Sequence, residues 1–277
     1  MKVLFVPVNY NSYDALETYI ASVGKALEVA ADPTIEVKIH VADNSTSQKA
    51  DANNCPWPMV QYQLSHYDNP GYLPAALKTV YSEDYASYDY IIISNVDVTL
   101  DDTFFTALRD LKADADTVWI APFIWSPSEQ RDVNPKILER YTKKRLRLLR
   151  LLFACPPLYY LYTRTLYRRK VSRSEESGVR SEDYKYKNIY AGHGSFMIFR
   201  PEIFLQEPKL DYPVFLFCEE IYMAEMALRI GKKVTHCPSV KVWDKEHAST
   251  GLMNLWRYCK YNHDALSYII RTFYEQD

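Results

Sequence analysis

Polar side chains follow the most hydrophobic stretch of the chain. Residues 88–102 read YDYIIISNVDVTLDD, and the isoleucines at 91–93 are typical of an inner strand that is covered on both faces. Asn95 and Asp97 come directly after this stretch. A carboxylate in that place can bind a divalent cation, or it can cap a helix, here one that begins near Asp102. The segment therefore combines a buried strand with a candidate cation ligand.

Two more polar residues follow predicted strands. Asn9 comes after a hydrophobic stretch at 2–8, and Asp43 ends another at 35–43. The pattern predicts helices over 12–29, 72–81 and 103–111, and further strands over 60–64, 90–94 and 117–124. Such alternation predicts an α/β fold with a doubly wound, mostly parallel sheet flanked by helices. Because ligands bind outside the carboxyl ends of the strands in these sheets, Asn9, Asp43 and Asp97 are expected to line one edge.

Composition and missing motifs exclude several classes of protein. With 48% hydrophobic and 25% charged residues, the 277-residue chain has the composition of a soluble globular protein. The N-terminus lacks a signal-peptide pattern, and no run of about 18 apolar residues predicts a membrane span. The five cysteines are scattered, which favours a reduced, cytoplasmic compartment. Without a P-loop or a G-x-G-x-x-G motif, any bound phosphate needs another neutralising group, such as a carboxylate-held cation.

One segment departs sharply from the average charge. Residues 140–173 hold 11 Lys or Arg and no acid, whereas the rest of the chain has 22 basic and 35 acidic residues. Leu146, Leu149 and Leu152 recur at helical spacing before the pair at 156–157 breaks the pattern. Two interpretations stay open: an interfacial element that contacts an anionic membrane surface, or a helical pair with its leucines packed inward. No nucleic-acid-binding module accompanies the basic run, so nucleic acid is not an expected partner.

Seven segments, in this order along the chain, resemble family 2 glycosyltransferases of the GT-A fold, especially their bacterial rhamnosyltransferase-like branch. The resemblance covers roughly residues 1–250. It rests on VPVNYNS (6–12), VADNST (41–46), DNPGYLPAAL (68–77), SNVDV (94–98), GHGSFMIFRPEIF (192–204), LFCEEIYMAEMALRIGKKV (216–234) and HAST (247–250).

The resemblance implies a nucleotide-sugar site. In this family the loop after the first strand and the acid after the second strand hold the base and the ribose. The corresponding residues here, together with two that pass close to the nucleotide and the residue at the first position of SNVDV, are Val8, Asn9, Tyr10, Asp43, Asn69, Gly71 and Asn95. A carboxylate suits this place because it accepts hydrogen bonds from a base imide or a ribose hydroxyl. Taken alone, Asp43 and the two residues after it are also compatible with a simple turn.

The resemblance also implies a divalent cation, Mg²⁺ or Mn²⁺. SNVDV corresponds to the family's D-x-D motif in its N-P-D-V form, so Asn95 replaces the first acid and Asp97 keeps the second. His247 corresponds to a late histidine that can approach the metal or the diphosphate. A single carboxylate implies a weakly bound cation whose coordination is completed by phosphate oxygens and water.

The catalytic residue implied by the resemblance is Glu220. LFCEEIYM aligns with the family's F-E-D-V-D-L, in which a carboxylate takes the proton of the acceptor hydroxyl. Glu219 is the alternative base, and both glutamates also suit the N-terminus of a helix expected at 221–230. The turn formed by His193, Gly194 and Ser195 is expected to approach the donor sugar or the acceptor.

Together these features predict an inverting glycosyltransferase that moves a hexose from a donor of dTDP-rhamnose or UDP-hexose type. The expected acceptor is a glycan or a lipid-linked glycan of surface polysaccharide synthesis. The expected protein is cytoplasmic and peripheral on the inner face of the membrane. Its expected parts are a nucleotide-sugar-binding half (1–125), a basic helical insertion (126–188) and an acceptor half with a C-terminal helix (189–277). The alternatives are an inactive scaffold of the same fold that binds glycan or membrane, and a nucleotidyltransferase.

Overall fold

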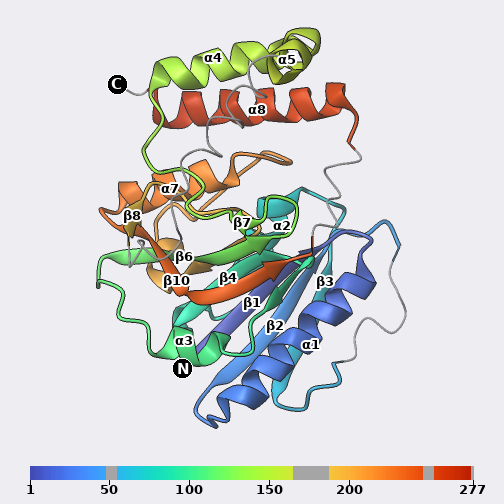
Figure 1. The fold of residues 1–277 in the computed structure, drawn as a ribbon, viewed down its shortest axis with the longest axis vertical. Coiled ribbons are helices and arrows are strands. Elements are labelled where there is room, and N and C mark those ends of the chain that lie inside the picture. Colours follow the sequence, from blue (N-terminus) through green and yellow to red (C-terminus); the bar gives the residue numbers. More distant parts are fainter. Residues whose placement is uncertain (48–54, 165–186, 246–252, 276–277) are drawn as a thin grey trace.

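The computed structural model describes residues 1–47, 55–164, 187–245 and 253–275. One sheet of ten strands forms the centre of the molecule (Figure 1). Its strands are β1 (Lys2–Asn9), β2 (Glu36–Asp43), β3 (Val60–His66), β4 (Tyr90–Asn95), β5 (Val98–Leu100), β6 (Thr117–Ser126), β7 (Arg131–Asp132), β8 (Lys187–Ile189), β9 (Phe196–Phe199) and β10 (Lys233–Asp244). The order across the sheet is β3-β2-β1-β4-β9-β6-β10-β5, with β7 beside β6 and β8 beside β10.

The sheet has a parallel half and a mixed half. Strands β3, β2, β1 and β4 are all parallel, and so are β6 and β10. The short strand β9 runs antiparallel between β4 and β6, and β5 closes the other edge antiparallel to β10. The α/β fold with long parallel pairings predicted from the sequence is confirmed, and the short antiparallel strands join its two halves.

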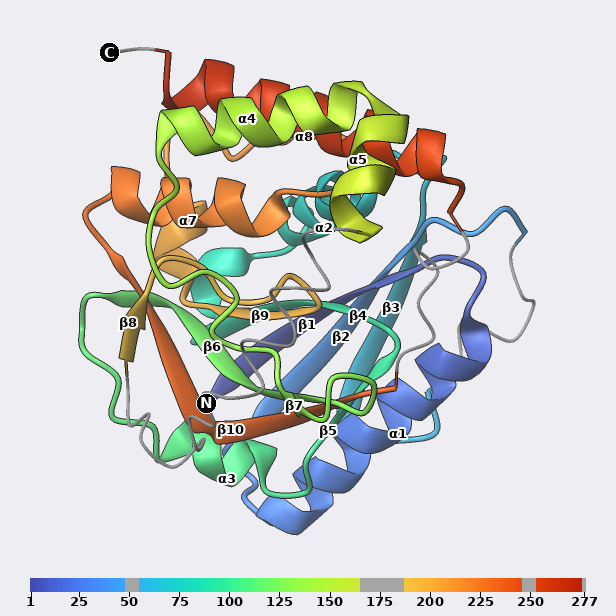
Figure 2. The ribbon, with the colours of Figure 1, turned by 45° about the horizontal axis from the view of Figure 1, so that its top comes forward.

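Helices cover both faces of the sheet (Figure 2). On one face lie α1 (Tyr13–Ala30) and α3 (Phe104–Arg109), and on the other lie α2 (Tyr72–Tyr81) and α7 (Glu219–Arg229). An outer layer above α7 holds α4 (Lys143–Ala154), α5 (Pro156–Tyr162) and α8 (Leu255–Phe273). Two short 3₁₀ turns span Tyr85–Ser87 and Pro201–Phe204. Strands from 1–125 and from 189–245 share one sheet and contribute to the hydrophobic clusters on both of its faces, which joins the two expected halves.

The basic segment folds as a helical pair that packs on the C-terminal helix. Thr142 caps α4 by accepting a hydrogen bond from the Arg145 amide, and α4 lies along α8. Leu146 is fully buried against α8, whereas Leu148 and Leu151 are 59% and 62% exposed. The leucines of α4 therefore face both inward and outward. None of the helices in the described residues is long and apolar enough to cross a membrane.

An ion pair ties this outer layer to α7. Arg140 donates through Nε and Nη2 to the two carboxylate oxygens of Glu225, at 2.7 and 2.9 Å. The hydroxyl groups of Tyr190 and Tyr274 also donate to this carboxylate, which is 5% exposed. Arg140 thus has a structural partner, although it belongs to the basic run recognised in the sequence.

Candidate active site

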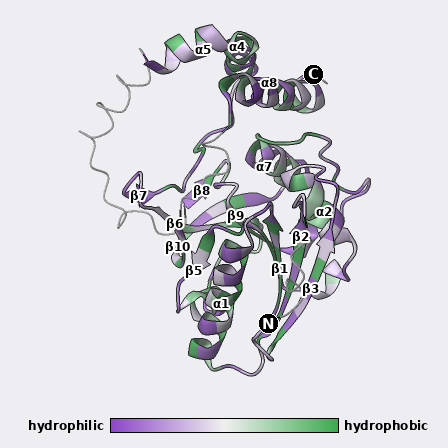
Figure 3. Ribbon diagram, turned by 90° about the vertical axis from the view of Figure 1, so that its right-hand side faces the viewer, coloured by the Kyte–Doolittle hydropathy of each residue, from purple (hydrophilic) through white to green (hydrophobic). Residues whose placement is uncertain are grey.

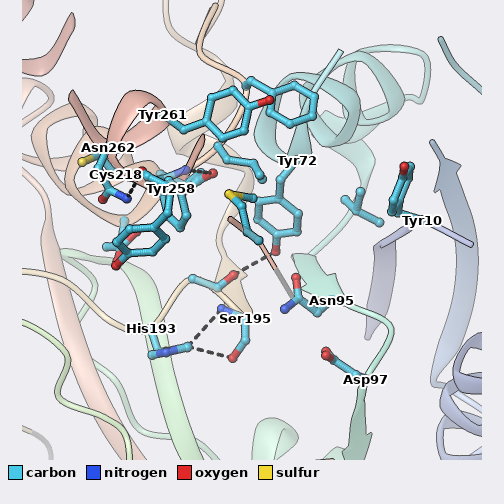
Figure 4. Close-up of a pocket in the computed structure, with 18 of the residues that line it drawn as sticks. Tyr10, Tyr72, Asn95, Asp97, His193, Ser195, Cys218, Tyr258, Tyr261 and Asn262 are labelled. Carbon is cyan, nitrogen blue, oxygen red and sulfur yellow. Dashed lines mark hydrogen bonds between the residues drawn. The ribbon is translucent and has the colours of Figure 1, made fainter. Parts of the chain in front are cut away.

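A cleft of about 1070 Å³ opens between the carboxyl ends of the central strands and the helices α7 and α8 (Figure 4). Ten of the residues predicted for the site line it: Val8, Tyr10, Asn69, Asn95, Asp97, His193, Gly194, Ser195, Glu219 and Glu220. They come from segments that lie more than 200 residues apart in the sequence. His247 lies outside the described residues.

Asn9 and Asp43 lie behind the wall of the cleft. Both side chains are fully buried, and the Asn9 amide donates to Asp43 Oδ1 at 2.9 Å. The same carboxylate accepts hydrogen bonds from Ser45, from the Tyr13 hydroxyl at 2.8 Å and from His66 at 3.1 Å. Burial by itself raises the pKa of Asp43, but these hydrogen bonds outweigh it and the net pKa is lowered. In this structure the ionised Asp43 joins the loops after β1, β2 and β3.

Gly71 brings the next loop close to the segment before α7. Its φ is +116°, and a Cβ built there would lie 2.2 Å from the Phe215 carbonyl oxygen. That carbonyl accepts a hydrogen bond from the Tyr72 amide, and the Gly71 carbonyl accepts one from the Asn44 side chain at 3.1 Å. Only glycine combines this backbone conformation with so close an approach. The contact therefore fixes one end of the segment that carries the two glutamates.

Asp97 is the one acidic side chain that the strand ends contribute to the cleft lining. Its carbonyl accepts a hydrogen bond from the Lys245 amide, and the Asn95 amide donates to the Ser195 carbonyl. The described residues contain no group of three or more His, Cys, Asp or Glu that could hold a metal ion. Within the described ranges, the donor set fits a cation held jointly by Asp97 and ligand oxygens rather than by these protein groups alone. Asp97 does not cap the next helix, because α3 begins at Phe104 after Thr103.

Two residues of unusual backbone conformation precede the glutamates. Phe217 has φ 74° and Cys218 has φ 60°, and neither is a glycine. The turn ends with the Phe217 amide donating to Glu219 Oε1 at 2.8 Å. The helix α7 therefore begins at Glu219, two residues earlier than its sequence pattern indicates, and its first turn points into the cleft. Strained backbone of this kind is found preferentially at functional sites.

The two glutamates differ in environment. Glu219 is buried, and burial together with the neighbouring Glu220 raises its pKa to about 8. Glu220 is partly exposed, and its Oε2 lies 3.7 Å from the point that a Cβ on Gly194 would occupy. Burial therefore favours the protonated form of Glu219. Glycine at position 194 leaves the space in front of Glu220 open.

The turn at 193–195 presents a neutral imidazole. The Ser195 amide donates to His193 Nδ1 at 3.2 Å, and the Ser195 hydroxyl lies 2.8 Å from the same nitrogen (Figure 4). The His193 amide in turn donates to Asn134 Oδ1 at 2.7 Å. Burial, and then the positive charge of Lys136, lower the pKa of His193 to about 3. Since Nδ1 accepts from the backbone, the proton lies on Nε2, where it can be donated to a hydroxyl or phosphate oxygen.

Sequence reasoning missed part of the lining. Tyr72 is half-buried between the two acidic regions of the cleft, and its hydroxyl donates to the Gly194 carbonyl at 2.8 Å. The N-terminal part of α8 adds an aromatic wall, in which Tyr258 packs on Phe217 and Tyr261 on Phe215, with ring centroids 5.1 and 5.0 Å apart. The available signal was the aromatic-rich run LWRYCKY at 255–261, which lies in the C-terminal helix expected from the sequence.

Comparison with known proteins identifies the fold but not the family. No family model and no curated protein matches this chain. Among solved structures, GalNAc-T7 with UDP, GalNAc and Mn²⁺ matches with a TM-score of 0.54 and 13% identity, over 88% of this chain and 43% of that one. The mannosyltransferase PcManGT from Pyrobaculum calidifontis with GDP-Man and Mn²⁺ gives a TM-score of 0.49 and 12% identity, over 93% of this chain and 60% of that one. The chain thus spans less than two thirds of either protein, and the first match indicates a GT-A glycosyltransferase fold.

Proposed function

We propose that the protein is an inverting glycosyltransferase that uses a nucleotide-diphosphate sugar, of dTDP-rhamnose or UDP-hexose type. The observation that carries this proposal is the convergence of three features in one cleft of a GT-A fold. These are Asp97 at the end of the central strands, the glutamate pair at the start of α7, and the turn that holds His193. The resemblance to family 2, and to its rhamnosyltransferase-like branch, supports the same function. GalNAc-T7, whose fold is similar, was solved with UDP, GalNAc and Mn²⁺, which are ligands of this chemical class.

Each part of the cleft has a role in this reaction. Val8, Tyr10 and Asn69 lie where the nucleotide would bind, and Asp97 would hold a divalent cation together with diphosphate oxygens. Bound there, the cation would neutralise charge on the leaving nucleoside diphosphate. Glu220 accepts the acceptor hydroxyl proton as that oxygen bonds to the anomeric carbon and the bond from this carbon to phosphate breaks. Protonated Glu219 and neutral His193 provide hydrogen-bond donors beside the reacting groups.

We further propose that the acceptor is a glycan or lipid-linked glycan, and that the outer helices contact an anionic membrane surface. The helices α4 and α5 expose four leucines, each 47–62% accessible, beside several arginines and lysines. In the ribbon coloured by hydropathy, α5 carries both hydrophobic and hydrophilic residues (Figure 3). These outer leucines are Leu148, Leu151, Leu158 and Leu161. Apolar side chains flanked by cations favour binding at the boundary between headgroups and acyl chains.

The function is tested by nucleotide binding. Calorimetry with UDP, dTDP and GDP, each with and without Mn²⁺, should detect binding of at least one nucleotide that Mn²⁺ strengthens. Asp97→Asn should remove the Mn²⁺ effect without unfolding the protein. A matched control is Asp102→Asn, since Asp102 is an exposed acid that pairs with Lys25 outside the cleft. Failure of the wild-type protein to bind any of the nucleotides, or an unchanged Mn²⁺ effect in Asp97→Asn, would overturn the proposal.

A further inference from the structure

Three aromatic side chains form a partly exposed platform at the end of β6 and β10. Phe123 and Trp125 stack with ring centroids 6.3 Å apart and planes at 11°, and Trp243 meets Phe123 edge-on at 6.3 Å. Trp125 and Trp243 are direct neighbours in the parallel pairing of the two strands. Trp243 is 39% exposed and the other two rings are half-buried. Large aromatic rings left accessible on a sheet indicate a binding surface.

The platform lies on the same face of the sheet as the cleft. Val242 belongs to the core beneath the opposite face, where α1 and α3 pack, so its neighbour Trp243 points to the face that carries α7. Trp243 pairs with Thr99 of β5, and the ladder continues through the hydrogen bond from the Lys245 amide to the Asp97 carbonyl. Because side chains two residues apart share a face, the carboxylate of Asp97 and the platform lie on one side of the sheet.

Two further contacts connect the platform to the site. Asn134 donates through its side-chain amide to the Pro122 carbonyl at 2.8 Å, and its Oδ1 accepts from the His193 amide. The residue after Pro122 is Phe123, so one asparagine joins the platform strand to the turn at the cleft. The strand that carries Phe123 and Trp125 is therefore connected through Asn134 to the His193 turn of the cleft.

The position of the platform indicates which substrate it meets. The residues assigned to the nucleotide lie at or after the ends of β1, β2, β3 and β4, on one side of the strand order, whereas the platform lies on β6 and β10 on the other side. Aromatic rings stack on the C–H faces of pyranose rings, and the nearby Thr99 and Lys241 can donate to sugar hydroxyls. A flat surface with these groups suits neutral sugar units rather than a diphosphate.

We propose that the platform binds the acceptor, and that this acceptor is an oligosaccharide of at least two sugar units. The terminal unit would lie at Glu220, and a preceding unit would stack on Trp125 and Trp243. This inference rests on the proposed glycosyltransferase function, and it adds the chain length of the acceptor and the residues that recognise it.

Direct glycan binding tests the inference. The purified protein is applied to an array of immobilised mono- to hexasaccharides, and the strongest free glycan is then titrated by calorimetry with and without nucleoside diphosphate. We expect binding only from disaccharides upward. Trp125→Ala and Trp243→Ala should each weaken it about 3- to 10-fold, the contribution usual for one aromatic contact. Nucleoside diphosphate binding should stay unchanged, because the platform lies outside the nucleotide region.

Matched variants separate recognition from folding. Trp256→Ala is the control, since Trp256 is 64% exposed and lies outside the cleft lining. If an alanine variant does not fold, Trp243→Tyr and Trp243→Thr take its place, and only the tyrosine should retain binding. Binding of monosaccharides alone, of no glycan on the array, or equally by the wild type and the tryptophan variants would overturn the inference. A wild-type protein that binds no nucleoside diphosphate would instead contradict the proposed function.

Discussion

Glu219 should make the stability of the protein depend on pH between 5 and 8. Its carboxyl is buried beside Glu220, and its pKa is raised from the ordinary 4.5 to about 8. The unfolded chain releases this proton near pH 4.5, whereas the folded protein keeps it to about pH 8. The contribution of this carboxyl to the free energy of unfolding is therefore fully present below pH 4.5 and is lost as the pH rises through 8. A change of one in pKa corresponds to about 1.4 kcal/mol, so this group should cost about 3–4 kcal/mol between pH 5 and pH 8.

Glu219→Gln isolates this contribution. Glutamine keeps an oxygen that can accept from the Phe217 amide, and it cannot ionise. From pH 5 to pH 8 the wild type should lose about 3–4 kcal/mol of unfolding free energy relative to the variant, because only the wild type has a carboxyl at position 219. In melting temperature this is roughly 6–8 °C at about 2 °C per kcal/mol for a chain of this size. A difference that stays constant across this range would show that Glu219 is ionised throughout, and would refute the reasoning.

The same pair of glutamates predicts a kinetic contrast. Glu220→Gln removes the proton acceptor and should lower transfer to a confirmed acceptor about 10²- to 10⁴-fold while nucleotide binding survives. Glu219→Gln should retain most of the transfer rate at pH 7, because Glu219 already carries a proton there. The opposite result, with only Glu219→Gln inactive, would place the base one residue earlier. Full activity of both variants would contradict the mechanism.

Three other perturbations follow from the packing around the site. In chemical denaturation, Gly71→Ala should lower the unfolding free energy by at least about 2–3 kcal/mol. Gly231 also has a positive φ, +66°, but has open space around it, so Gly231→Ala should cost only about 1 kcal/mol. Equal costs would contradict the close approach of Gly71 to Phe215. Arg140→Ala should cost about 2 kcal/mol because it leaves the Glu225 carboxylate buried without its ion pair, discounted for the half-exposed arginine; an unchanged melting temperature would contradict this. Replacing the four outer leucines with serine should abolish sedimentation of the protein with anionic vesicles at low salt, whereas serine at the exposed Leu205 and Leu228 should not. Added salt should weaken the sedimentation of the wild type, because it screens the attraction between exposed charges over about 8–10 Å. A wild-type protein that does not bind the vesicles would refute the membrane contact.

The parallel half of the fold could be predicted because its signals are local. The stretches at 2–8, 35–43 and 90–94 are apolar and short, and the helix at 72–81 has the same bounds as α2. Strands β5 and β9 carry no such signal, since each has only three or four residues. They form because they pair with the longer strands β10, β4 and β6. Sequence periodicity does not reveal such pairing between distant segments.

In the candidate site, too, some residues have a local sequence signal and others depend on contacts between distant segments. Residues that end a strand or begin a helix could be proposed from the sequence, and of these Asp97 and Glu220 line the cleft. Tyr72 could not be assigned, because its place depends on how the loop at Phe215 folds over α2. The burial of Asp43 was also hidden, since its four side-chain donors come from three different segments of the chain.

The backbone before α7 explains why the glutamates lie where they do. Left-handed conformations at non-glycine residues such as Phe217 and Cys218 are unfavourable by about 1–3 kcal/mol each, and persist only where the surroundings impose them. Here the Tyr212 hydroxyl donates to the Phe217 carbonyl, and Glu219 accepts from the Phe217 amide. The buried carboxyl of Glu219 thus holds the turn that directs Glu220 into the cleft. One acid stabilises the local conformation in its neutral form, and this leaves the other, more exposed acid available to take a proton.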